Sequence, residues 1–311
     1  MAKTKHGNKQ YYISIILLSL IIGIITINIK FMAQKQQQSN VINNENPEII
    51  SLNQNITDIN NEILKVEQKL KQLENIEEEI KEEQNNLYKN AKKLEDLILE
   101  NKVNKKIAYL TFDDGPYNNT YKVLEILKNN NVKATFFTTN INGDYCYDNK
   151  TTNCHNLYQE YLKEGHTLAN HTYTHAIWRG LYNSTESFMT AVINQENMIN
   201  KITDGYTTNI VRFPGGSKTA GSLKNSIIKE LRDRNYGWVD WTAQDGDGGN
   251  LSSVTEARNN FYGSINQNIE VVLFHDYNKI TTSLLQEFID YLHKENYILL
   301  PLFYESNMVN K

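Results

Sequence analysis

Seven side chains in the second half of this chain have types and spacings that suit metal-assisted hydrolysis. Two adjacent carboxylates, Asp113 and Asp114, stand in "TFDDGP", where the apolar run "IAYLTF" ends. Like charges side by side repel, and burial costs each of them hydration, so we expect a cation to stabilise the pair. His171 and His175 in "HTYTH" are four residues apart, which brings two imidazoles within reach of one ion. Two histidines and one carboxylate, with an open fourth position, describe a catalytic divalent-metal site, with zinc as the default.

The other members of the set could move protons and hold charge. One carboxylate of the pair would bind the ion, and the other would stay ionised and take a proton from water. Arg212 in "RFPGG" is permanently charged and suits this base as a partner. His275 in "LFH" is a candidate general acid, and Asp247 could hold its imidazolium. Taken alone, the two histidines of "HTYTH" could equally be hydrogen-bonded loop residues.

Each of these residues stands at the end of a predicted β-strand. From about residue 105, short β-rich runs alternate with helical stretches, which predicts parallel strands covered by helices. About 200 residues suit one small α/β barrel, whose catalytic residues gather at the carboxyl ends of the strands. The predicted strands are 107–112, 133–139, 166–171, 209–213, 236–241, 270–275 and 297–300, and the helices 119–130, 156–164, 184–202, 222–234, 253–262 and 281–294.

Five motifs, "TFDDGP", "HTYTH", "RFPGG", "DWTAQDGDG" and "LFH", resemble in order and spacing those of the polysaccharide deacetylase family, the NodB-homology enzymes of carbohydrate esterase family 4. The resemblance covers roughly 105–300 and implies a distorted (β/α) barrel of about seven strands, with a catalytic domain at 105–305. It also implies one divalent ion, usually zinc, with cobalt and other ions as alternatives. The implied roles are Asp113 as base, Asp114, His171 and His175 as metal ligands, Arg212 as the residue that orients the base, and His275 as acid tuned by Asp247.

The substrate side of the implied site departs from the family at two glycines. Gly215 stands where many members have tyrosine after R-x-P, although its backbone N–H could still bind an oxyanion. Gly248 replaces an aromatic residue that forms a wall of the sugar groove in many members. Pro214, Gly215 and Trp241 are the candidates for substrate or oxyanion contacts, with core packing as the alternative for Trp241. Asp245 is the alternative to Asp247 in its motif.

The amino-terminal region predicts attachment to a membrane. Residues 13–29 form a nearly uninterrupted apolar run with lysines before it. About 20 such residues span a bilayer, and the cationic flank stays in the cytoplasm. We therefore predict a cytoplasmic tail at 1–12, a transmembrane anchor at 13–30 and a linker at 31–47, in a single-pass protein of the cell membrane with an extracellular catalytic domain. The alternative is a cleaved signal peptide and a secreted enzyme.

A heptad pattern of apolar residues follows the linker and continues to Ile98 with two lapses, Glu77 and Gln84. It predicts a coiled-coil stalk over 48–101, most simply in a homodimer. The alternative is a single charged helix that packs on the globular domain. Cys146 and Cys154 predict a disulfide outside the cytoplasm, with free thiols or a cluster with His155 as alternatives.

Together these features predict removal of N-acetyl groups from a cell-surface polysaccharide, with N-acetylglucosamine of peptidoglycan as the leading candidate. The alternatives are chitin oligomers, other exopolysaccharides, acetyl xylan esters, or a catalytically silent, membrane-tethered scaffold that binds glycan. The net charge of −4, without a polybasic segment, argues against nucleic acid as a partner.

Overall fold

The computed structural model describes residues 47–140, 145–146 and 149–311, and the chain divides into two units, Met1–Leu87 and Tyr88–Lys311. The predicted tail, the transmembrane anchor and, apart from Pro47, the linker lie outside the described residues. Among the residues that are described, no helix combines the length and the apolar character that a membrane span requires. The anchor therefore stays a prediction.

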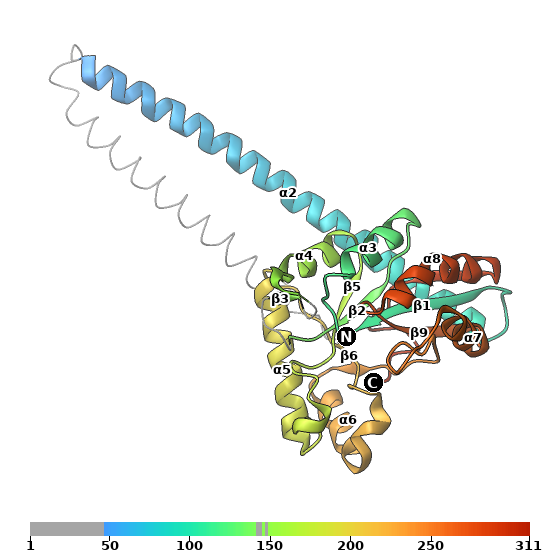
Figure 1. Ribbon diagram of the computed structural model, residues 1–311. Coiled ribbons are helices and arrows are strands. Elements are labelled where there is room, and N and C mark those ends of the chain that lie inside the picture. Colours follow the sequence, from blue (N-terminus) through green and yellow to red (C-terminus); the bar gives the residue numbers. More distant parts are fainter. Residues whose placement is uncertain (1–46, 141–144, 147–148) are drawn as a thin grey trace. The chain divides into compact units, whose positions relative to one another are not determined.

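Helix α2 (Pro47–Leu99) is continuous for 53 residues (Figure 1). After Pro47 it contains no proline or glycine, and it is rich in the strong helix formers Glu, Lys and Leu. In the first unit, the heptad residues Leu52, Ile59, Val66 and Leu73 are exposed. A coiled coil would need a second copy of the chain to cover these residues, and this homodimer also stays a prediction.

The last turns of α2 belong to the second unit and pack into its core. Ala91 and Ile98 are buried there, and Tyr88 stacks on Phe303 with ring centroids 5.2 Å apart. These positions continue the heptad pattern, so the carboxyl-terminal end of the predicted stalk covers the chain's own globular unit. For this end of the helix, the structure matches the alternative of a helix packed on the domain.

Glu95 joins this end of α2 to two distant segments. Its buried carboxylate accepts hydrogen bonds from Tyr109 Oη at 2.6 Å, from Ser306 Oγ at 2.5 Å and from the Asn307 backbone N–H at 2.8 Å. A buried donor that loses its acceptor costs about 1–3 kcal/mol. Glu95 is therefore expected to stabilise the second unit.

We expect Glu95→Ala to lower the free energy of unfolding of the full chain by about 3 kcal/mol, because it leaves buried donors unpaired. Urea unfolding measures this difference. Glu100→Ala, which changes an exposed glutamate just after the same helix, is the matched control and should stay within about 0.5 kcal/mol of the parent. Equal stability of the two variants would contradict the prediction.

The second unit is built on a curled, parallel sheet. Its hydrogen-bonded order is β7-β6-β5-β2-β1-β9-β8, and β10 pairs with β1 outside this path. Within the described residues β7 and β8 are not paired with each other, so the sheet forms a half-barrel, in line with the predicted barrel of about seven strands. The strands are β1 (Lys106–Asp113), β2 (Thr135–Thr138), β5 (Thr167–Asn170), β6 (Ile210–Val211), β7 (Gly237–Trp238), β8 (Ala243–Gln244), β9 (Ile269–His275) and β10 (Tyr297–Leu300).

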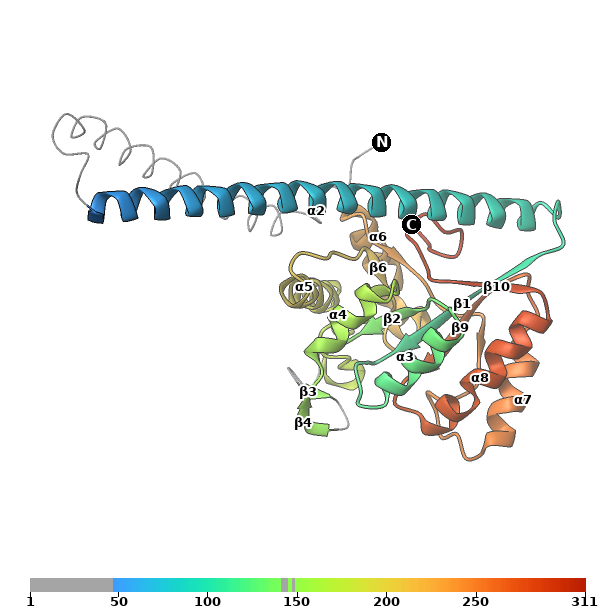
Figure 2. The same ribbon diagram turned by 90° about the horizontal axis from the view of Figure 1, so that it is seen from above.

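Helices cover the outer face of this sheet. Figure 2 shows α3, α8 and α7 beside β1 and β9, and α5 and α6 contact each other beside β5 to β7. Every predicted helix of the unit is present, to within two residues at each end. The helices are α3 (Thr120–Asn129), α4 (His155–Lys163), α5 (Thr185–Ile202), α6 (Lys224–Asp233), α7 (Val254–Ser264) and α8 (Lys279–Lys294), with the 3₁₀ turns η1 (Ile177–Arg179) and η2 (Ser217–Leu223).

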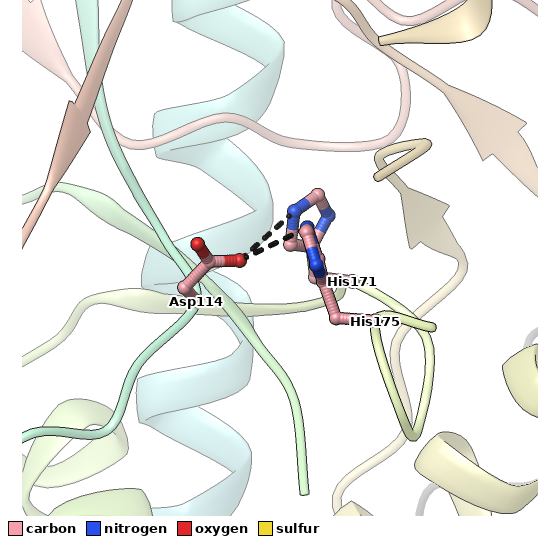
Figure 3. Close-up of side chains that lie close together, drawn as sticks. All are labelled: Asp114, His171 and His175. Carbon is pink, nitrogen blue, oxygen red and sulfur yellow. Dashed lines mark ion pairs between the residues drawn. The ribbon is translucent and has the colours of Figure 1, made fainter. Parts of the chain in front are cut away.

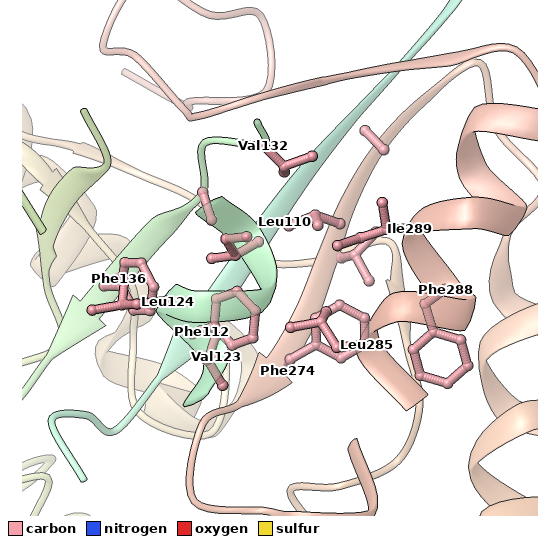
Figure 4. Packing of buried hydrophobic residues seen from close by; sticks show 14 of the residues in the cluster. Leu110, Phe112, Val123, Leu124, Val132, Phe136, Phe274, Leu285, Phe288 and Ile289 are labelled. Carbon is pink, nitrogen blue, oxygen red and sulfur yellow. The ribbon is translucent and has the colours of Figure 1, made fainter. Parts of the chain in front are cut away.

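Side chains of the two central strands, β1 and β9, point alternately toward the hydrophobic core and toward the site. Side chains of a strand point to opposite faces in turn. In β1, Leu110 and Phe112 pack outward against α3 and α8, where Phe112 stacks on Phe136 at 5.1 Å and Phe274 of β9 lies beside it (Figure 4). The alternate positions, which end at Asp113 and His275, therefore face the inside of the curled sheet.

An excursion between β2 and α4 forms a small antiparallel hairpin, β3 (Tyr145–Cys146) and β4 (Asn149–Asn153). The sequence did not predict these strands. Cys154, directly after β4, is buried and disulfide-bonded, and Cys146 is the only other cysteine of the chain.

Candidate active site

Strand register brings the predicted site residues to one edge of the sheet. Asp113, the last residue of β1, is the register partner of His275, the last residue of β9. On the other side of β1 the pairing runs through β2 to Asn170 of β5, and Asn170 is paired with Val211 of β6. His171 and Arg212 each come directly after these paired residues. Residues more than 150 positions apart in sequence are therefore neighbours at the carboxyl edge.

Three of these side chains form a cluster that fits a divalent cation. One ligand atom from each of Asp114, His171 and His175 lies within 4.8 Å of the other two (Figure 3). Asp114 Oδ1 lies 3.4 Å from Nε2 of His171 and 3.2 Å from Nε2 of His175. This oxygen is buried and accepts no hydrogen bond from the described residues. An orphaned carboxylate oxygen that faces two imidazole nitrogens is a donor set suited to zinc.

Backbone geometry and a hydrogen bond aim these ligands. Nδ1 of His171 lies 2.9 Å from the Arg212 carbonyl oxygen, which fixes the proton on Nδ1 and leaves the Nε2 lone pair toward the cluster. Asp114, Thr172 and His175 have positive φ values of 72°, 66° and 48°, in the left-handed region that residues other than glycine seldom adopt. Asn170 supports this loop, because its Oδ1 accepts a hydrogen bond from the Thr172 N–H.

Charges in the cluster favour a bound cation. Burial alone would raise the pKa of Asp114, but the nearby imidazoles of His171, His175 and His275 outweigh it, so the pKa is lowered and the carboxylate is ionised. Burial and the charge of His171 lower the pKa of His175, which leaves it neutral and able to act as a ligand. Burial also acts to lower the pKa of His171, but the charges of Asp113 and Asp114 raise it. These two carboxylates therefore create a negative potential beside His171, which is where a metal ion would bind.

Asp113 lies beside the cluster and is held by Arg212. Arg212 Nη1 donates to Asp113 Oδ1 at 2.8 Å and to Thr111 Oγ1 at 2.7 Å, and both charged side chains are buried. The guanidinium also lies over the ring of Phe137, with Cζ 4.2 Å from the ring centroid. The other oxygen, Asp113 Oδ2, is 3.5 Å from Nε2 of His171. Arg212 thus occupies one carboxylate oxygen and leaves the other turned toward the cluster.

His275 and Asp247 form the second charged pair, next to the cluster. His275 Nδ1 lies 2.7 Å from Asp247 Oδ1, and the His275 backbone N–H donates to Asp247 Oδ2 at 2.6 Å. Burial would lower the pKa of His275, but the hydrogen bond and charge of Asp247, followed by the charges of Asp114 and Asp113, raise it to about 10. His275 is therefore a cation, with Nε2 3.8 Å from Asp114 Oδ2.

The residues predicted to contact the substrate lie in the loop that follows β6 or pack against it. Gly215 is exposed with φ +71°, and a Cβ at this position would lie 3.0 Å from Thr219 Oγ1 and 3.3 Å from Ile177 Cδ1. Pro214 is buried, and its carbonyl accepts from Tyr182 Oη at 2.8 Å. Trp241 is half-buried, and its ring packs on Gly216, where a Cβ would lie 3.0 Å from the indole. Trp241 also packs against the buried cluster that contains Val239 and Val271, so core packing accounts for part of its burial.

Gly248 has a steric reason that the sequence did not reveal. A Cβ at this position would lie 2.7 Å from Cε1 of His275. An aromatic side chain here would displace the imidazole, so this chain has no room for one at this point.

The sequence analysis did not identify three buried side chains near the site, Thr120, Asp276 and Thr281. The hydroxyl of Thr281, on α8, lies within hydrogen-bond distance of both Asp245 and Asp247, and Asp276 accepts a short hydrogen bond from Thr120. Asp276 also lies against the backbone of Gly115, where a Cβ would be 2.6 Å from its Oδ2. Burial and the charge of Asp114 raise the pKa of Asp276 to about 7. The D-x-D spacing of 245–247 and the Asp that follows His275 were the available signals.

Known proteins resemble this chain in sequence and in fold. A family model described as polysaccharide deacetylase matches residues 100–232. A peptidoglycan-N-acetylglucosamine deacetylase of Bacillus cereus is 30% identical over 167 residues, which cover 52% of this chain and 55% of that protein. A chitin deacetylase of Colletotrichum lindemuthianum is 29% identical over 194 residues, covering 61% and 75%. The chain spans about half to two thirds of the length of several such relatives, from 49% to 65%.

A solved structure is similar to this chain in fold. The crystal structure of the catalytic domain of peptidoglycan N-acetylglucosamine deacetylase from Eubacterium rectale ATCC 33656 superimposes with a TM-score of 0.59 at 30% identity. The match covers 67% of this chain and 93% of that domain.

Proposed function

Because the chain belongs to the polysaccharide deacetylase family, the NodB-homology enzymes of carbohydrate esterase family 4, we propose that it is a metal-dependent hydrolase that removes N-acetyl groups from a glycan. The observation that carries this proposal is the position of Asp113. It is a buried carboxylate, fixed by Arg212 at 2.8 Å, beside a three-residue cluster that fits a divalent cation. This arrangement supplies a general base next to an ion site.

The side chains of this unit divide the reaction between them. A bound divalent ion, with zinc as our proposal, would supply Lewis-acid polarisation of the amide carbonyl and of water. Asp113 takes a proton from the attacking water through the oxygen that Arg212 leaves free. The backbone N–H of Gly215 would bind the developing oxyanion, as the family resemblance implies. His275 gives its proton to the amine nitrogen as the C–N bond breaks, so acetate and a free amino sugar leave.

We propose N-acetylglucosamine of peptidoglycan as the substrate. Relatives named for that activity support this choice, and so does the predicted amino-terminal anchor, which would hold the catalytic unit outside the cell membrane. Trp178, 93% exposed in η1 three residues after His175, offers an aromatic surface on which a sugar ring could stack. Chitin oligomers, other acetylated polysaccharides and acetyl xylan esters are the substrates to compare with it.

The test is acetate release by the full chain from a panel of acetylated glycans. We expect release from peptidoglycan fragments in the presence of zinc, its loss on treatment with a chelator, and its return when zinc is added back. Release from chitin oligomers or xylan esters alone would reassign the substrate. Glycan binding without any acetate release would make the chain a scaffold and overturn the proposal.

The raised pKa of His275 predicts how activity depends on pH. A histidine with a folded pKa of about 10, against about 6.5 unfolded, contributes stability below pH 6.5, and the contribution is lost as the pH rises through 10. As general acid, it should stay protonated through neutral pH. We expect Asp247→Asn to move the alkaline fall in kcat to lower pH by about one unit or more, because the negative partner is removed.

The pH profile of acetate release measures this shift. Asp290→Asn, an exposed aspartate on α8, is the matched control and should leave the profile where it is. An unchanged alkaline limb in Asp247→Asn would remove Asp247 from its assigned role.

A further inference from the structure

Asp245 and Asp247 form a buried pair of carboxyl groups that share one hydroxyl. Both residues are almost fully buried, with 0% and 1% of their surface exposed. Thr281 Oγ1 lies 2.7 Å from Asp245 Oδ2 and 2.9 Å from Asp247 Oδ2. A threonine hydroxyl has a single proton, so it can donate to only one of these two oxygens. The second short contact requires a proton from another source.

The charges around the pair show where that proton resides. Asp247 has a cationic partner in His275, which contacts both of its carboxylate oxygens. Asp245 forms no ion pair with any described residue, and its other oxygen accepts only the Asp247 backbone N–H at 3.2 Å. From α7, the neutral amide of Asn260 donates to the Asp245 carbonyl at 3.0 Å, and Lys279, the first residue of α8, is exposed. Two buried carboxylates with one cation favour a single ionised group.

We propose that Asp245 is a protonated carboxylic acid at neutral pH and acts as a positioning residue for the general acid. Its O–H donates to Thr281 Oγ1, and the Thr281 hydroxyl donates in turn to Asp247 Oδ2. Asp247 then remains the ionised member, with each oxygen fixed by a donor, and it holds the His275 ring with Nε2 toward the cluster. Burial and the charge of Asp247, which raise the pKa of Asp245 to about 8, agree with this assignment.

The neutral form of Asp245 explains why the protein tolerates a second carboxyl group so close to Asp247. An ionised Asp245 would compete with Asp247 for the Thr281 proton and for His275. A neutral Asp245 adds a donor to the chain of hydrogen bonds, which stabilises the Asp247 carboxylate without a second negative charge. The consequence for the enzyme is that Asp245 acts through Thr281 and Asp247 and does not contact the substrate.

Infrared difference spectroscopy of the full chain with ¹³C-labelled aspartate tests the protonation state directly. At neutral pH, Asp245→Asn should remove a carbonyl stretch of a protonated carboxyl group. Loss of a carboxylate band instead would overturn the proposal. If this variant does not fold, Thr281→Val and Thr281→Ser carry the test. Valine removes the acceptor of the acid proton and should shift the protonated band, whereas serine keeps the band in place. A protonated band that Thr281→Val leaves in place, or the absence of any such band in the parent, would overturn the proposal.

Kinetics test the positioning role, and this part rests on the proposed function. Asp245→Ala and Thr281→Val should each lower kcat for acetate release about tenfold with little change in KM, because the general acid is less well oriented. Asp245→Asn keeps a neutral donor and should recover most of the loss, as should Thr281→Ser. Full activity in both Asp245→Ala and Thr281→Val would contradict the role. If the parent releases no acetate, the proposed function fails, while the infrared result still decides the protonation of Asp245.

Discussion

Asp113→Asn should lower kcat for acetate release about a thousandfold while the protein still binds one equivalent of zinc. An amide has no basic oxygen that can take a proton from water, and a positioned general base contributes about 10²–10⁴ in rate. Asparagine can still accept the hydrogen bond that Arg212 donates at 2.8 Å, so the buried guanidinium keeps one polar contact. We therefore expect a folded but nearly inactive protein, measured by acetate release and metal content.

The control for this change is Asp233→Asn, which makes the same substitution at an exposed residue of α6 that pairs with Lys229. Its turnover should equal that of the parent. Near-normal turnover of Asp113→Asn would remove Asp113 from the role of base. Loss of zinc together with activity would indicate that Asp113 serves the ion site and not the water.

Asp114→Asn should weaken zinc binding by more than about a hundredfold, with a parallel loss of activity at limiting zinc. Residues that merely support a metal ligand change affinity about 10–100-fold when mutated, and a ligand should matter more. The substituted amide would also remove the ionised oxygen that lies 3.2 Å and 3.4 Å from the two imidazoles. Calorimetric titration of the full chain with zinc measures the affinity, and excess zinc should restore part of the activity.

Asp204→Asn provides a matched control, because Asp204 is an exposed aspartate that also has a positive φ, 52° against 72° for Asp114. This control tests whether an asparagine in the left-handed region alters zinc affinity by itself, away from the cluster. Unchanged zinc affinity in Asp114→Asn would contradict the three-residue ion site. Asp113→Asn should keep its zinc affinity, and Asp114→Asn should lose most of it. This difference distinguishes the general base from the metal ligand in the adjacent pair.

The end of α2 matters for how the catalytic unit is prepared. Because Glu95 is buried and holds Tyr109 and the segment at Ser306, a chain cut at residue 105 lacks part of its own core. A shortened protein meant for these assays should therefore begin before Tyr88.

The sequence alone determined the local features of this protein. Apolar runs of four to eight residues and helical periodicity identified the helices and the longer strands, because both signals depend on near neighbours along the chain. The five motifs indicated the family, and the residue types Asp, His and Arg indicated the chemistry. The strands β8 and β3 were not predicted because each has only two residues, and β4, "NKTTN", was not predicted because it has no apolar residue to give an alternating pattern.

Only the tertiary structure decided how these residues meet. Strand register placed Asp113 beside His275 and Arg212 beside Asp113, over separations of about 100 residues or more. Contacts between distant segments place the last turns of α2 in the second unit. They also make Asp247, and not Asp245, the partner of His275, and they place the Thr281 hydroxyl between the two carboxyl groups. The physical reason is that burial and hydrogen-bond sharing depend on contacts between distant segments, which local sequence patterns do not encode.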